Sequence, residues 1–114
     1  MRNMPLNILI YFLQTYAPFF NNRGAVNLKI GNYHATLSDC SAALDLLHPP
    51  CDANAAQRAK AHLRRAKALD ALDLPDKAMG EYEAAAKALP DNESVQNELE
   101  CARQQQKQAR NNNA

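Results

Sequence analysis

An internal repeat with a period of 42 residues restricts the possible folds of this chain more than any other feature. Four positions of one segment correspond at that spacing to four positions of a later one: Gly24, Leu37, Ala43 and Leu44 match Ala66, Met79, Ala85 and Ala86. Small residues at two of these positions let helix backbones approach closely. Each segment also carries apolar residues at the i, i+3, i+4 spacing of a helix face. The repeat therefore predicts an all-α fold in which helix pairs stack on one another.

Turn and capping residues divide the chain further. We expect two helix pairs over residues 21–90, a C-terminal capping helix over 91–110 and a disordered tail over 111–114. Within the pairs, the expected helices cover residues 21–30, 33–47, a stretch ending near 72, and 75 to about 90, with turns at Gly31–Asn32 and at the prolines after His48. Asp91 is the expected N-cap of the capping helix. Its apolar stripe consists of Val95, Leu99 and Ala102, and the polar sequence after Arg103 is expected to fray.

Residues 1–20 form a distinct apolar segment. The run from Leu6 to Leu13 is apolar and aromatic, and Pro18 closes it. It is too short to span a membrane, and no convincing signal-peptide cleavage site follows. We expect a short helix that docks on the next helices and covers the face of the helix that carries Asn22. A membrane or secretory tether is the alternative.

Composition argues against several classes of function. A net charge of +1 disfavours a dedicated nucleic-acid binder. Three widely spaced cysteines fit a reducing, cytoplasmic environment. Apart from the spacing of His48 and Cys51, nothing suggests a zinc site, and no nucleophile motif or phosphate-binding loop occurs. We therefore expect no metal, no cofactor, no membrane partner and no enzymatic activity.

The helix expected around residue 60 carries a row of cationic side chains next to its apolar face. Lys60, Arg64 and Lys67 lie within one arc of a helical wheel. The neighbouring arc is apolar and consists of Ala59, Leu63, Ala66 and Leu69. A cationic face next to a buried apolar face is either a solvated surface or a binding site for an acidic ligand.

The repeated segments resemble the tetratricopeptide repeat. Gly31–Tyr33 is similar to the inter-helix turn of that family, and the second half of its motif is matched by Ala78, Tyr82, Ala85 and Pro90. The family unit is about 34 residues long, so the extra residues lie in the loop at Pro49–Ala55. Thr36 and Cys40 depart from the motif, which prefers alanine and an aromatic residue there. The resemblance covers residues 20–90 and implies tandem helix pairs of an α-solenoid fragment.

A narrower resemblance is to co-chaperones of this family that hold the acidic C-terminal peptide of heat-shock chaperones in a dicarboxylate clamp. The clamp draws an asparagine from one helix and a lysine and an arginine, four residues apart, from the next. Asn22, Lys60 and Arg64 match those positions, and Lys29 lies on the same face as Asn22. An amide, an ammonium and a guanidinium together make charge-assisted hydrogen bonds to a pair of carboxylates. The implied peptide-binding residues are therefore Asn22, Lys29, Lys60 and Arg64.

Three segments, Ala42–Pro50, Asp52–Ala55 and Lys60–Arg65, resemble dynein-assembly co-chaperones in particular. This implies a cytoplasmic adaptor that works with a chaperone and with other dynein assembly factors in preassembling ciliary dynein arms. Residues 1–20 do not match the family's preceding repeat, which supplies the clamp's remaining lysine and asparagine. We therefore expect a fragment with an incomplete groove. The alternative is a structural scaffold that packs on a partner protein without recognising a carboxylate.

Overall fold

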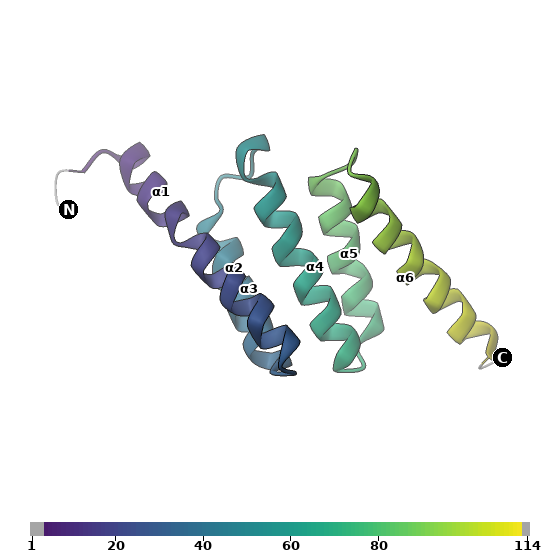
Figure 1. Cartoon of the computed structure of the whole chain (residues 1–114). Coiled ribbons are helices and arrows are strands. Elements are labelled where there is room, and N and C mark those ends of the chain that lie inside the picture. Colours follow the sequence, from purple (N-terminus) through teal and green to yellow (C-terminus); the bar gives the residue numbers. More distant parts are fainter. Residues whose placement is uncertain (1–3, 113–114) are drawn as a thin grey trace.

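The computed structural model describes residues 4–112, and this part of the chain is helical with no strands, as predicted. It contains α1 (Leu6–Thr15), α2 (Ala17–Lys29), α3 (Tyr33–Leu46), the 3-10 helix η1 (Asp52–Asn54), α4 (Ala55–Ala71), α5 (Pro75–Ala88) and α6 (Glu93–Asn112). From α2 onward each α-helix packs on the next, and α2 also packs on α4. The helices therefore form a row with α1 at one end and α6 at the other (Figure 1).

The first helix of each pair ends in the same kind of turn. Gly31 follows α2 with φ of 85°, and the next amide donates to the carbonyl of Asn27. Asp73 follows α4 with φ of 62°, and the next amide donates to the carbonyl of Leu69. Both are Schellman-type endings, which need one residue in the left-handed region. The predicted turn at Gly31–Asn32 is thus confirmed, and it recurs 42 residues later.

The main core lies among α4, α5 and α6. Its buried members are mostly small: Ala59, Ala66, Leu69, Ala78, Tyr82, Ala85, Ala86, Val95 and Leu99. Val95, Leu99 and the partly buried Ala102 confirm the predicted apolar stripe of α6. Because alanine side chains are short, the helices can approach closely while burying apolar surface.

The helices α2 and α3 approach each other closely at Gly24. A Cβ atom added at Gly24 would lie 2.8 Å from Sγ of Cys40, which is fully buried. Such a distance is well inside van der Waals contact. The prediction that Gly24 allows close helix approach is confirmed, and Cys40 lies in the interior at this contact.

Three predictions about helix ends are wrong, and other ends differ by one or two residues. The helix expected to begin at residue 21 begins at Ala17, because Pro18 is compatible with a first helical turn. The amide of Val95 donates to Oδ1 of Asn92 at 3.0 Å, so the cap of α6 is Asn92 and not Asp91. Beyond Arg103 the chain does not fray but stays in α6 to residue 112.

The C-terminal half of α6 has a physical reason to remain helical. Its glutamines, arginines and lysine are good helix formers. In addition, the amide of Gln106 donates to the carboxylate of Asp76 in α5 at 3.1 Å. The predicted disordered tail therefore overlaps α6 at residues 111–112, and residues 113–114 lie outside the described part of the chain.

The N-terminal helix α1 does not dock as expected. None of its residues is buried, although Gln14 donates to the carbonyl of His48 at 2.6 Å. Only Tyr16 separates α1 from α2, and its backbone angles are nearly helical. As a result α1 projects onward from α2 and does not fold back over the helix that carries Asn22 (Figure 1). Within residues 4–112, no helix has the length and apolar character needed to cross a bilayer.

Candidate peptide-binding site

Two hydrogen bonds join α2 to α4 at the seam where the predicted site lies. The side-chain amide of Asn21 donates to the carbonyl of Gln57 at 3.0 Å. In the other direction, Nη1 of Arg64 donates to the carbonyl of Asn21 at 2.9 Å. Asn21 itself is buried. These contacts set the relative position of the two helices from which Asn22, Lys60 and Arg64 project.

Arg64 is held next to the backbone of Asn22. Its guanidinium is partly buried, and one of its nitrogens is used on the carbonyl of the preceding residue, Asn21. Lys60, one turn earlier on α4, is exposed, as is Asn22 on α2. Among residues 4–112 neither of these two side chains has a hydrogen bond or ion pair. The site therefore has one donor in a set position and two that are open to solvent.

Lys29 and Lys67 have different surroundings. Lys29 is exposed in the last turn of α2, two turns beyond Asn22 on the same helix face. Lys67 instead lies 3.5 Å from the carboxylate of Glu98 in α6. The third cation of the arc around Lys60 is thus directed to the capping helix. Lys29 is still positioned to contact a long ligand lying along α2.

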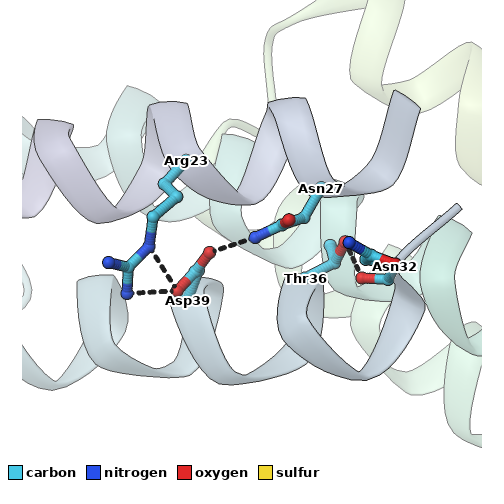
Figure 2. Close-up of polar contacts among 5 residues, drawn as sticks. All are labelled: Arg23, Asn27, Asn32, Thr36 and Asp39. Atoms are coloured by element: carbon cyan, nitrogen blue, oxygen red, sulfur yellow. Dashed lines mark hydrogen bonds and ion pairs between the residues drawn. The ribbon is translucent and has the colours of Figure 1, made fainter. Parts of the chain in front are cut away.

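A buried carboxylate that sequence analysis missed fixes α2 against α3. Asp39 lies between Arg23 and Asn27 in Figure 2, and all of its hydrogen-bonding partners there come from α2. Oδ1 accepts from Nε and Nη2 of Arg23 at 3.0 and 2.7 Å, and Oδ2 accepts from Asn27 at 2.7 Å. The hydrogen bond to Asp39 raises the pKa of the Arg23 guanidinium, and burial opposes this with a smaller effect. The Arg23 guanidinium also lies 5.2 Å from the ring centroid of Phe19.

This network orients the helix on which Asn22 and Lys29 lie. One signal was available in the sequence, since Arg23 and Asn27 are four residues apart on α2 and Asp39 interrupts the buried face of α3. Thr36 stands where the tetratricopeptide motif prefers alanine, and the structure shows how the extra hydroxyl is accommodated. This buried hydroxyl donates a hydrogen bond to the carbonyl of Asn32 at 3.0 Å (Figure 2).

The second helix pair has its own polar contacts. Glu81 of α5 accepts from Arg65 at 3.2 Å, and its other oxygen lies 2.6 Å from Nδ1 of His62. Burial raises the pKa of the Cys40 thiol to about 11, so this group is a neutral core residue and not a nucleophile. Among residues 4–112, no group of three or more His, Cys, Asp or Glu side chains is placed to hold a metal ion.

Comparison with known proteins supplies a second line of information. No protein-family model matches the chain. A rat (Rattus norvegicus) protein is 41% identical over 97 residues, which make up 85% of this chain and 23% of the rat protein. A mouse (Mus musculus) protein is 46% identical over 82 residues, which make up 72% of this chain and 20% of the mouse protein. Both are named dynein axonemal assembly factor 4. The chain is similar to this assembly factor.

The predicted resemblance to a dynein assembly factor is therefore confirmed. The chain spans about a fifth of the length of the dynein axonemal assembly factor 4 relatives that it matches. Asn22, Lys29, Lys60 and Arg64 stay predicted site residues. The structure brings Arg64 to the residue beside Asn22 and leaves Lys60 exposed one turn away.

Proposed function

We propose that the chain is a tetratricopeptide-type interaction module that binds the acidic C-terminal peptide of heat-shock chaperones and acts as an adaptor in dynein assembly. The role in dynein assembly is supported by similarity to dynein axonemal assembly factor 4. The repeat-like architecture is supported by successive helix packing and by turns that recur at the period of the sequence repeat. In this proposal the module acts in the cytoplasm by binding alone and catalyses no reaction.

One observation carries the proposed peptide recognition. The hydrogen bond from Arg64 to the carbonyl of Asn21 holds a guanidinium beside Asn22, with the exposed ammonium of Lys60 one turn away. A guanidinium has five N–H donors, so Arg64 keeps donors for a ligand after bonding to Asn21. A carboxylate accepts only, and it matches such a group of donors through charge-assisted hydrogen bonds. The terminal and side-chain carboxylates of an acidic peptide supply the required acceptors.

The second candidate is a scaffold that packs on a partner without reading a carboxylate. It is favoured by the large apolar side chains exposed along α1 and α2, among them Tyr11, Phe19 and Val26. Exposed apolar patches often mark protein interfaces. The two candidates differ in their dependence on charge, since apolar packing does not require a free terminal carboxylate.

Calorimetric titration with a peptide that ends in Glu-Glu-Val-Asp separates the candidates. The free-acid peptide should bind and its C-terminal amide should bind much more weakly. A hydrogen bond to a charged group contributes about 1.5–3 kcal/mol, so Lys60→Ala should weaken binding roughly 10-fold or more. Asn22→Ala should have a smaller effect because the amide donor is neutral. Added salt should weaken binding further.

Lys60→Ala is the most informative variant because Lys60 is exposed and its loss leaves no buried group unpaired. Arg64→Ala should weaken binding to a similar degree, but it also removes the bond to Asn21, so its folding must be checked by circular dichroism. Lys77→Ala removes the same charge from an exposed position on α5 and serves as the matched control. Equal binding of acid and amide, or equal effects of Lys60→Ala and Lys77→Ala, would favour the scaffold.

A further inference from the structure

The helix α1 and one face of α2 together form an apolar arm on the surface. Nine large apolar side chains between residues 6 and 30 are 42% to 70% exposed: Leu6, Ile8, Tyr11, Phe12, Leu13, Tyr16, Phe19, Val26 and Ile30. Elsewhere in residues 4–112, Leu74 is the one large apolar side chain with comparable exposure. Exposed apolar surface is thus concentrated in one region.

The arm has the properties of a surface that is covered in the working protein. Residues 4–22 contain no charged side chain. The exposed apolar residues of α1 occupy most of its circumference, apart from the side that carries Asn7 and Gln14, and apolar patches of this extent commonly mark interfaces. None of the 10 residues of α1 is buried, so its apolar side chains are open to solvent in the single chain.

The direction of α1 keeps it from covering the exposed face of the helix α2 that follows it. Since Tyr16 has nearly helical backbone angles, α1 and α2 follow one another as a nearly continuous rod that leaves the helix row (Figure 1). The exposed stripe of α2, with Phe19, Val26 and Ile30 at i, i+7 and i+11, lies farther along that rod. The helix α1 cannot reach this stripe while the rod stays extended, but a second rod lying antiparallel can.

The spacing of the exposed residues fits such a pairing. Phe12 lies seven residues before Phe19, and Val26 lies seven residues after it. Farther out, Ile8 lies eleven residues before Phe19 and Ile30 lies eleven after it, so all five residues share one face of the rod. A two-fold axis near Phe19 therefore brings Phe12 of one copy opposite Val26 of the other, and Ile8 opposite Ile30. In a two-fold interface each such contact occurs twice.

The exposed area is sufficient for a stable dimer. An aromatic side chain buries about 150–250 Å² when fully covered, so nine apolar side chains about half exposed present roughly 900 Å². The largest apolar patch on a typical monomer is about 300–600 Å². Covering two thirds of the arm on each copy would bury roughly 1,200 Å² in total, at the lower limit for specific interfaces.

We propose that two copies of this chain associate through the apolar arm, with α1 of each copy packed antiparallel on α2 of the other. Residues 4–22 carry no charge and the charge of Arg23 is paired with Asp39, which favours self-association because the centres of two identical arms then meet with little like-charge repulsion. The pairing does not depend on peptide binding at Asn22, Lys60 and Arg64.

Sedimentation equilibrium of the full chain at micromolar concentrations tests this association. The native chain should have twice the mass of one chain. Phe12→Glu and Val26→Arg should each raise the dimer dissociation constant at least about 100-fold, because each places a charge in the apolar interface twice. Both positions are exposed in the single chain, so circular dichroism should be unchanged. Gln105→Glu, an exposed position on α6, is the control and should leave the dimer intact.

Mixing the two arm variants tests the arrangement itself. If α1 packs on the partner's α2, an equimolar mixture of Phe12→Glu and Val26→Arg should form a dimer about 10-fold or more tighter than either alone, because opposite charges then face each other. A monomeric native chain, or arm variants with the native dissociation constant, would overturn the proposal. So would a mixture no tighter than its components. Binding of a monomeric native chain to neutral phosphatidylcholine vesicles would assign the arm to a lipid surface instead.

Discussion

The two glycines inside helices provide a direct test of the packing between α2 and α3. Gly24 and Gly80 are both in helix interiors, but a Cβ at Gly24 would lie 2.8 Å from Sγ of Cys40, whereas a Cβ at Gly80 meets nothing within 4 Å. Replacing a helix-interior glycine with alanine gains about 1 kcal/mol of intrinsic helix stability. We therefore expect Gly80→Ala to stabilise the protein by about that amount.

At Gly24 the same gain is opposed by overpacking. Inserting a methyl group into a well-packed interior costs about 1–3 kcal/mol. The net effect of Gly24→Ala should then be a destabilisation of up to about 2 kcal/mol. Because the helix-propensity gain is common to both variants, the difference between them isolates the packing cost of about 1–3 kcal/mol.

Urea denaturation followed by far-UV circular dichroism gives the required free energies of unfolding. The cause can be identified with Cys40→Ala, which removes the sulfur that the new methyl group would meet. In the double variant Gly24→Ala/Cys40→Ala, the destabilisation should be smaller than the sum of the two single effects. If Gly24→Ala stabilises the protein as much as Gly80→Ala, or if the two single effects simply add, α2 and α3 do not approach as closely as described.

Three further predictions concern other parts of the fold. Asp73→Gly should raise the thermal midpoint, with a gain of about 1 kcal/mol, because Asp73 has φ of 62°; Gly31→Ala, at the equivalent turn, should lower it. Asp39→Asn should destabilise the chain by about 1–3 kcal/mol in urea denaturation, because Arg23 loses its anionic partner; an unchanged midpoint would contradict the role of the network. Stability should fall as pH rises from about 9 toward about 11, because the Cys40 thiol ionises first in the unfolded chain, and denaturation of Cys40→Ala should show a weaker initial decline.

Local sequence signals predicted the helical fold and most of its boundaries. Gly31 and Pro75 mark a helix end and a helix start through their own backbone restrictions, which act regardless of distant contacts. The small residues repeated at Gly24 and Ala66 predicted close helix packing, because the size of a side chain limits how near a neighbouring helix can come. These features are properties of single residues or of neighbours on one helix, so the sequence by itself determined them.

The candidate site was determined only in part by the sequence. Asn22, Lys60 and Arg64 were found from their spacing, but the bond from Arg64 to the carbonyl of Asn21 depends on how α2 meets α4. Likewise, the partner of Lys67 could not be predicted, because Glu98 lies 31 residues away in the chain. The buried carboxylate of Asp39 was missed because its partners lie on another helix.

The direction of α1 was decided by the tertiary structure alone. Its apolar sequence predicted burial, and the nearest apolar surface in the chain was the expected place for it. The nearly helical conformation of Tyr16 instead carries α1 away from the helix row. Apolar composition specifies that a surface must be covered, but not by what, because the hydrophobic effect has no direction. Which surface covers it depends on backbone geometry and on the shapes that packing brings together.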